Sequence, residues 1–260
     1  MKVDFYGKKI VTGLQDGRVI ILEKIDQKFQ ITNELFAHTG PVMKVDISFP
    51  KFGSLILTGG FDRKVNLWRE TANHSYEKIY EYAFHYNCIT ALAFSNYSQE
   101  LIFASGSLDG ELVLHQYKKD NFYHHRVDAY EYGINSIHFN KYNNYSLITS
   151  GNDNKVKLWN FNIDTSQWEN ETIIVDDDSI NICCAYRNAE SNDLSFVVSN
   201  DQGEVFYYDK LNGSWKRKQL YQNKSMIIQL EWTENGKNLV MIDEEGKHFL
   251  FDENSFILCN

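Results

Sequence analysis

Short apolar segments alternate with polar turns along the whole chain. The clearest unit begins with His-Thr-Gly-Pro at 38–41, runs through alternating apolar and polar residues at 42–47, and continues into the apolar segment 55–58. It closes with Val-Asn-Leu-Trp at 65–68. Alternation with a period of two residues is the pattern of a strand that buries one face. This unit therefore predicts three short strands joined by tight turns.

The closing strand recurs along the chain, and the copies are about 45 residues apart, close to the period of WD repeats. Its copies stand at 19–22, 65–68, 112–115, 156–159, 205–208 and 248–251. This repeat predicts an all-β fold, a six-bladed WD-repeat β-propeller. It also predicts a single domain over 1–260. The expected blades are approximately 1–37, 38–84, 85–129, 130–176, 177–224 and 225–260.

Polar residues recur at fixed positions within three of the units, where WD repeats place a structural hydrogen-bond relay. They are His38, Thr58, Asp62 and Trp68; His85, Ser105, Asp109 and His115; and Thr149, Asp153 and Trp159, with Tyr130 in the histidine position. An acid–base pair for catalysis is the alternative interpretation of His38 and Asp62. Recurrence in several units favours the structural role, because a catalytic constellation is not expected in repeated copies. We expect no catalytic residue and no enzyme activity.

The composition limits the possible partners. The net charge of −9 and the pI of about 5.4 argue against a nucleic-acid ligand, which needs clustered Lys and Arg. The short basic run 216–218 is expected in a solvated loop, as is the acidic run 176–178, which lacks calcium-loop spacing. The four cysteines show no C-x-x-C spacing, so we expect free thiols, no metal site and no cofactor. No segment approaches the length of a membrane span, which predicts a soluble protein.

Several segments resemble one family of WD-repeat proteins closely. These are 38–42 (HTGPV), 49–53 (FPKFG), 60–65 (GFDRKV), 128–135 (DAYEYGIN) and 153–159 (DNKVKLW). They resemble the Sec-thirteen family, the propeller shared by the COPII outer coat and the Y-shaped scaffold of the nuclear pore. Tyr130, His115 and Phe251 depart from the family pattern, which indicates a divergent, reduced member.

The resemblance implies a non-catalytic scaffold in ER-to-Golgi transport and in the nuclear pore outer ring. The implied partners are an α-solenoid subunit of the COPII coat and a scaffold nucleoporin, each donating a β-blade. The implied locations are the cytoplasmic side of ER exit sites and COPII vesicles, and the nuclear pore, with only indirect membrane contact. A sister propeller restricted to the pore and a WD-repeat peptide or substrate receptor are the alternatives.

The first blade offers little chain for its innermost strand, because the turn at Gly7 and Lys8 comes about six residues from the start, roughly 20 Å of extended chain. We therefore expect no strand to be donated to blade six and only a short outer strand from 255–260. The resulting open ring would leave one apolar face uncovered on each end blade. The expected partner-binding residues are Phe5, Ile10, Val19 and Ile21 on blade one, and Leu230, Trp232, Leu239, Met241 and Phe249 on blade six.

Overall fold

The computed structural model describes residues 1–95, 98–141, 146–162, 165, 167–174, 179–187, 194–233, 236–252 and 257–259. The chain forms two compact units, Met1–Ile134 and Asn135–Asn260. Over the described residues the only helix is one 3-10 turn, η1 (Pro50–Phe52), and every other regular element is a strand. No helix in this part of the chain has the length and apolar character needed to cross a membrane.

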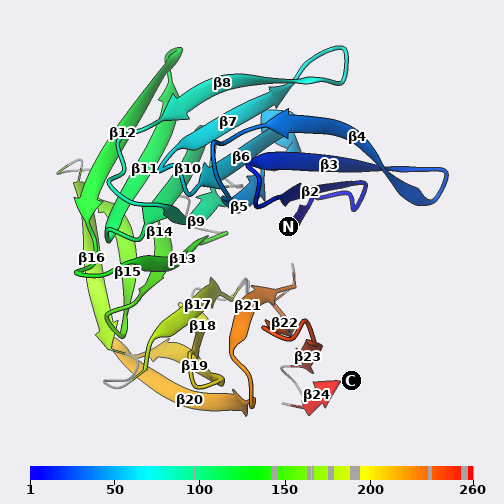
Figure 1. Cartoon of the computed structure of the whole chain (residues 1–260). Helices are drawn as coiled ribbons and strands as arrows, with labels where there is room; N and C mark the ends of the chain where they lie inside the picture. Colours follow the sequence, from blue (N-terminus) through cyan, green and yellow to red (C-terminus); the bar gives the residue numbers. More distant parts are fainter. Residues whose placement is uncertain are drawn as a thin grey trace. The chain divides into compact units, whose positions relative to one another are not determined.

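Unit 1 contains three four-stranded antiparallel sheets, which we call blades 1, 2 and 3 (Figure 1). Blade 1 consists of β1 (Lys2–Val3), β2 (Lys9–Gly13), β3 (Arg18–Ile25) and β4 (Lys28–Phe36). Blade 2 consists of β5 (Val42–Ile47), β6 (Leu55–Gly60), β7 (Val65–Glu70) and β8 (Tyr76–Tyr82). Blade 3 consists of β9 (Ile89–Phe94), β10 (Leu101–Ser107), β11 (Glu111–Lys118) and β12 (Asn121–Asp128). Figure 1 shows the β3–β4 hairpin reaching beyond the other strands of its blade.

Unit 2 contains three further antiparallel sheets of four strands, blades 4, 5 and 6. Blade 4 consists of β13 (Ile134–Phe139), β14 (Ser146–Gly151), β15 (Lys155–Asn162) and β16 (Gln167–Ile174). Blade 5 consists of β17 (Asn181–Tyr186), β18 (Ser195–Asn200), β19 (Glu204–Leu211) and β20 (Ser214–Gln222). Blade 6 consists of β21 (Ile227–Trp232), β22 (Asn238–Asp243), β23 (His248–Asp252) and β24 (Ile257–Cys259).

The hydrophobic cores lie between consecutive blades of the same unit. In unit 1 one cluster joins blades 1 and 2 and another joins blades 2 and 3; in unit 2 the clusters join blades 4 and 5, and 5 and 6. A middle blade is therefore covered on both faces, and all six residues of β6 are buried. This explains why β6 reads as a continuous apolar run rather than as an alternating strand.

Glycines in the β2–β3 and β10–β11 turns hold the loops that follow the outer strands β4 and β12. Gly17 and Gly110 have φ values of +90° and +84°, and a Cβ at either would lie 2.1 Å from a carbonyl oxygen, that of His38 or Tyr130. Their own carbonyls accept hydrogen bonds from two successive backbone N–H groups of the loop that follows the outer strand. Only glycine combines this backbone conformation with so close an approach. These turns hold the loops that carry His38 and Tyr130.

The prediction of an all-β WD-repeat propeller fold with six blades is confirmed. The innermost strand of blade 1, β1, has only two residues, and the C-terminal strand β24 pairs with β23. The expectation of a loop for the basic run 216–218 is wrong, because these residues lie in β20. The acidic run 176–178 lies outside the described residues, and the assignment of one domain to 1–260 stays a prediction.

Candidate functional site

One face of blade 1 is packed tightly against blade 2. Val11, Val19 and Ile21 are fully buried in the cluster that also contains Ile56 and Trp68 of blade 2. The expectation that Val19 and Ile21 lie on an uncovered face is wrong. Residues that alternate along a strand share a face, and the face that carries Val11, Val19 and Ile21 is the one that blade 2 covers.

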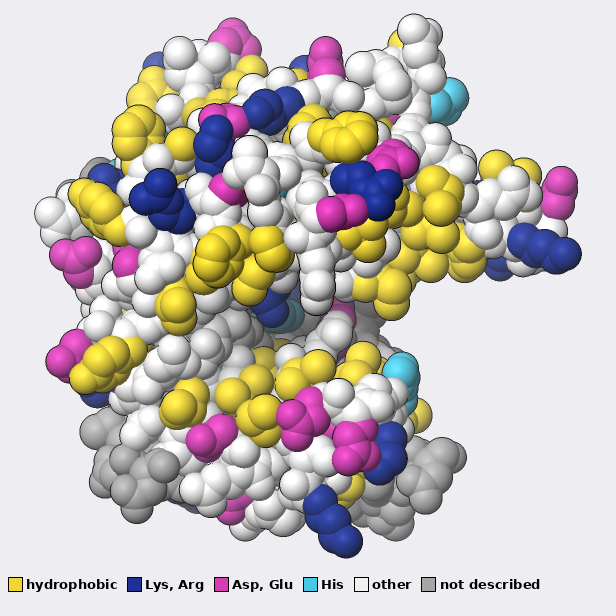
Figure 2. Space-filling view, in the orientation of Figure 1, with side chains coloured by type: hydrophobic (Ala, Val, Ile, Leu, Met, Phe, Trp, Pro, Cys, Tyr) yellow, Lys and Arg dark blue, Asp and Glu magenta, His cyan; other side chains and the backbone are white. Residues whose placement is uncertain are grey.

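The opposite face of blade 1 carries a second apolar row, which we call the free face. The cross-strand register pairs Val3 with Ile10, Ile10 with Leu22, and Leu22 with Ile31. Directly paired residues point to the same side of a sheet, so these four side chains line one face. Val3 is 51% exposed and Ile31 66% exposed, while Ile10 and Leu22 are half-buried. Figure 2 shows hydrophobic side chains gathered over the region that Figure 1 draws as β2 to β4.

Phe5 lies in the turn between β1 and β2, outside the free face. It is 54% exposed, and its ring meets the ring of Phe49, from the segment just before η1, edge to face with 4.6 Å between centroids. Of the four residues expected on the uncovered face of blade 1, the structure therefore places Ile10 on the free face, whereas Phe5 contacts Phe49 of blade 2. The sequence reasoning missed Val3, Leu22 and Ile31. They lie on three other strands, and only the register of the folded sheet places them beside Ile10.

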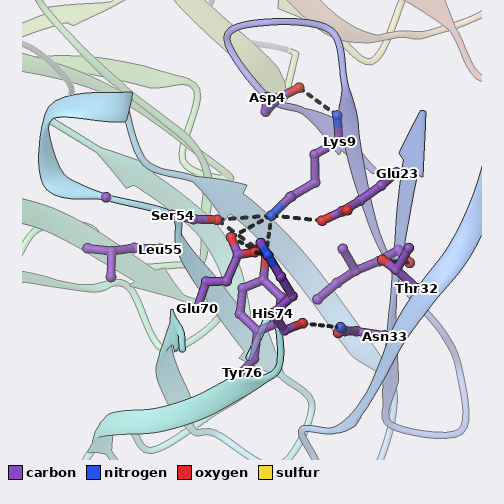
Figure 3. Close-up of polar contacts among 12 residues, drawn as sticks. Asp4, Lys9, Glu23, Thr32, Asn33, Ser54, Leu55, Glu70, His74 and Tyr76 are labelled. Atoms are coloured by element: carbon purple, nitrogen blue, oxygen red, sulfur yellow. Dashed lines mark hydrogen bonds and ion pairs between the residues drawn. The ribbon is translucent and has the colours of Figure 1, made fainter. Parts of the chain in front are cut away.

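A polar cluster around Lys9 fastens blade 1 to blade 2 (Figure 3). The Lys9 ammonium, on β2, donates to the Glu70 carboxylate at 2.7 Å, to the Tyr76 hydroxyl at 2.6 Å and to Ser54 Oγ at 3.2 Å, all in blade 2. It also lies 3.1 Å from the carboxylate of Glu23 in its own blade. An ammonium has three protons to donate, and here all three have acceptors within reach. Lys9 thus connects strands of both blades at one point.

The electrostatics of this cluster favour the charged pair. Burial alone would raise the pKa of Glu70, but hydrogen bonds from Lys9, Ser54 and His74 outweigh it and lower the pKa to about 2. Burial would lower the pKa of Lys9, yet its contacts with Glu70, Tyr76 and Glu23 raise it above the usual lysine value. Both groups are therefore ionised at neutral pH, and the contact between the two blades is charge-assisted.

Blade 6 repeats the two-faced arrangement in unit 2. The five residues expected on its uncovered face are Leu230, Trp232, Leu239, Met241 and Phe249. All five contribute to the cluster shared with blade 5, the first four buried and Phe249 partly buried against it. Their assignment to an uncovered face is wrong for the same reason as in blade 1. The side of blade 6 turned away from blade 5 carries Val240, Ile242 and Leu250 instead, and these are half-buried or exposed.

The relay of blade 2 is a continuous buried hydrogen-bond chain. Trp68 Nε1 donates to Thr58 Oγ1 at 3.1 Å, and Thr58 Oγ1 lies 2.9 Å from His38 Nε2. His38 Nδ1 lies 2.8 Å from Asp62 Oδ1, and Asp62 also accepts the backbone N–H of Thr39 at 3.1 Å. Burial lowers the pKa of His38 despite the nearby carboxylate, so the ring is neutral at neutral pH. The chain ties the loop before blade 2 to three strands or turns of that blade.

The relay of blade 3 has different ends. His85 Nε2 lies 2.8 Å from Ser105 Oγ, and Ser105 Oγ lies 3.0 Å from His115 Nε2. His115 Nδ1 lies 3.2 Å from the hydroxyl of Tyr80, which belongs to blade 2. An imidazole thus replaces the indole of blade 2, and the chain extends into the neighbouring blade.

At the acidic end of this relay, Asp109 does not hold the histidine by a hydrogen bond. Its carboxylate accepts the backbone N–H groups of Tyr86 and Asn87 at 2.8 and 3.2 Å. The carboxylate closest to His85 is that of Glu111, with Oε2 3.2 Å from Nδ1. The sequence reasoning missed Glu111 and Tyr80, because neither occupies a recurring position of the repeat.

In blade 4 the described contacts cover part of the expected relay. Trp159 Nε1 donates to Thr149 Oγ1 at 2.9 Å, which repeats the tryptophan–threonine contact of blade 2. Asp153 accepts the backbone N–H of Lys155 at 3.3 Å and pairs with its ammonium at 3.3 Å. Asp62, Asp109 and Asp153 each accept the backbone N–H of the residue two positions later.

Comparison with known proteins agrees with this geometry. The family described as "WD domain, G-beta repeat" matches residues 29–69 and 120–160. A protein of Emericella nidulans named "Protein transport protein sec13" is 23% identical over 97% of this chain and 89% of its own length. The Yarrowia lipolytica protein of the same name is 24% identical over 97% of this chain and 90% of its own. Over nearly its whole length the chain is thus similar to proteins named sec13, at the identity of a divergent relative. Another relative, "Protein SEC13 homolog" of Drosophila melanogaster, is 34% identical over 42% of this chain and 31% of its own.

Proposed function

We propose that this chain belongs to the Sec-thirteen family and is a non-catalytic scaffold subunit of the COPII outer coat in ER-to-Golgi protein transport. The observation that carries the proposal is the name of relatives that match nearly the whole chain, "Protein transport protein sec13". The relays agree with a non-catalytic role, since their histidines are buried and hydrogen-bonded within the blades. A buried histidine whose partners all belong to the fold stabilises structure.

The proposed partner is an α-solenoid coat subunit that adds a β-blade against the free face of blade 1. The row from Val3 to Ile31 supports this, because exposed apolar rows of this kind mark interaction sites. Covering a side chain of this size contributes about 1.5–3 kcal/mol when it becomes fully buried. The face of blade 6 that carries Val240, Ile242 and Leu250 is proposed as the second contact surface.

The Lys9 cluster gives the scaffold role a mechanical basis. A partner bound to the free face would transmit force to blade 1. Blade 1 is joined to blade 2 by a hydrophobic cluster and by the charged Lys9 cluster. We propose that this joint transmits rigidity to the partner at its junction with the propeller. Membrane contact would then be indirect, through the coat.

The test is purification of the tagged chain from its native cells, followed by identification of bound proteins. Recovery of an α-solenoid coat subunit supports the coat role. Recovery of nuclear-pore scaffold proteins with it adds the pore role, and their recovery alone favours the sister propeller over the coat protein. The free-face variant Leu22→Asp should lose the partner, whereas Lys119→Glu in the exposed β11–β12 turn should retain it.

A peptide receptor is the second candidate function, and one observation favours it. The exposed aromatic residues in loops or at loop ends of unit 1 include Phe36, Phe61, Phe84 and Tyr86. Aromatic side chains in such positions are typical of recognition surfaces. If Phe61→Ser and Phe84→Ser, rather than Leu22→Asp, abolish partner recovery, the receptor role replaces the blade-insertion role.

A further inference from the structure

The acidic end of the blade 3 relay contains two buried polar atoms without hydrogen bonds. His85 Nδ1 and Glu111 Oε2 lie 3.2 Å apart, yet neither makes a hydrogen bond. Both side chains are more than nine-tenths buried. Buried polar atoms are almost always satisfied, so an adjacent pair that is not calls for an explanation. The carboxylate of Asp109 also lies here, and one ligand atom from each of the three residues falls within 4.8 Å of the others.

The relay of blade 2 shows why such a pair does not arise there. The Trp68 indole N–H can only donate, so Thr58 accepts from it and donates its own proton to His38 Nε2. A neutral His38 then carries its proton on Nδ1, directed at Asp62. The tryptophan therefore fixes the direction of the whole chain and leaves no lone pair at Nδ1.

His115 removes this constraint in blade 3. An imidazole can donate or accept at either nitrogen, so the chain can run in the opposite direction. Tyr80 then accepts from His115 Nδ1–H, Ser105 donates to His115 Nε2, and Ser105 accepts from His85 Nε2–H. In this direction His85 Nδ1 presents a lone pair to the two carboxylates.

We propose that His85 Nδ1, the Asp109 carboxylate and Glu111 Oε2 bind a divalent transition-metal ion of the zinc type. One imidazole and two carboxylates suit zinc, whereas calcium and magnesium take oxygen ligands alone. Zinc bonds of about 2.0–2.1 Å in tetrahedral geometry place neighbouring ligand atoms ~3.3 Å apart. The spacing of 3.2 Å between His85 Nδ1 and Glu111 Oε2 fits this value. The proposal is independent of the partner-binding role.

The surroundings support the ligands. His85 donates from its second nitrogen to Ser105, as metal-bound histidines donate to an outer acceptor. Arg126 donates to Glu111 Oε1 at 2.5 Å, which orients the carboxylate and leaves Oε2 for the ion. The sequence predicted no metal site because its cysteines show no C-x-x-C spacing. These ligands were missed because they belong to the relay of blade 3 and to the start of β11.

The test measures zinc uptake by the tag-free full chain, with equilibrium dialysis and elemental analysis. We expect one equivalent of Zn²⁺, visible d–d absorption when Co²⁺ replaces it, and no uptake of Ca²⁺ or Mg²⁺. Glu111→Gln should weaken Zn²⁺ binding at least ~10-fold. His115→Trp should do the same without changing any ligand, because it restores a donor-only group at the end of the relay. His74→Gln is the matched control, since His74 lies against Glu70 on the surface.

Circular dichroism should show that the variants are folded. We expect this of His115→Trp because blades 2 and 4 already carry a tryptophan, Trp68 or Trp159, at the corresponding position. If His115→Trp is unfolded, Glu111→Gln decides alone. The proposal is overturned if the unmodified chain takes up no Zn²⁺. It is equally overturned if Glu111→Gln or folded His115→Trp binds Zn²⁺ as tightly as the unmodified chain, or if His74→Gln loses uptake.

Discussion

The two faces of blade 1 are made of similar apolar residues but differ in how far they are buried. The face with Val11, Val19 and Ile21 is buried completely against blade 2, and the Lys9 cluster joins the same two blades. The face with Val3, Ile10, Leu22 and Ile31 has no neighbouring blade within unit 1. Residue composition therefore does not distinguish a structural surface from an interaction surface. The position of the neighbouring blade distinguishes them.

The largest expected effect follows from removing volume on the packed face. Ile21→Ala should lower the free energy of unfolding by about 3–4 kcal/mol, because it deletes a fully buried side chain and leaves a cavity. Urea denaturation followed by fluorescence measures this. Leu22→Ala on the free face should cost less than about 1 kcal/mol, since Leu22 is only partly buried. Equal costs for the two variants would contradict the distinction between the faces.

The next effect tests the charged joint of the packed face. Lys9→Met should destabilise the chain by about 2 kcal/mol, because it leaves the Glu70 carboxylate partly buried without its ammonium. Lys24→Met, at an exposed position of β3, is the matched control and should stay within about 0.5 kcal/mol of the unmodified chain. A double variant with Glu70→Gln should recover part of the loss. If the two single effects simply add, the pair is not coupled.

The same joint predicts a dependence of stability on pH. The folded pKa of Glu70 is about 2, below the ordinary value of 4.5, so the folded state binds this proton less readily than the unfolded state. The stabilisation is therefore fully present above about pH 4.5 and is lost as the pH falls toward 2. Thermal unfolding between pH 2 and 6 should show a smaller acid-dependent loss in Lys9→Met than in the unmodified chain. Identical slopes would show that Lys9 does not set the pKa of Glu70.

The smallest effect on stability is expected on the free face, together with the largest effect on binding. Ile31→Lys should change the free energy of unfolding by less than about 0.5 kcal/mol, because this side chain is 66% exposed. The affinity for the α-solenoid partner should fall at least ~10-fold, since a buried charge without a counter-ion would result. Isothermal titration calorimetry compares Ile31→Lys with the unmodified chain against the same partner fragment. Loss of folding instead of binding would place Ile31 in the core.

The sequence predicted the strands, their grouping into six blades and the position of three relays. It did so because alternation and turn residues are local and recur with the repeat. It assigned Val19, Ile21 and the blade 6 residues to the wrong face, because both faces of these strands are apolar and local sequence does not say which one meets the next blade. The consequence is practical: Trp232→Asp disrupts the core between blades 5 and 6, so it does not report on partner binding.

The relay of blade 3 was only partly predictable for a different reason. Ser105 and His115 occupy recurring positions, but Glu111 and Tyr80 enter through the fold, one as the first residue of β11 and one from the neighbouring blade. Such contacts depend on how two blades pack against each other. A single sequence read along one repeat does not contain them.

Photo-crosslinking tests most directly the claim that the free face of blade 1 binds the partner. The crosslinking amino acid p-benzoylphenylalanine would replace Ile31 in one sample and Tyr123, an exposed residue of blade 3, in another. Both samples would be irradiated with the α-solenoid coat subunit, and the products identified by mass spectrometry. The account predicts a covalent product from position 31 and none from position 123. A product from position 123 alone would contradict it.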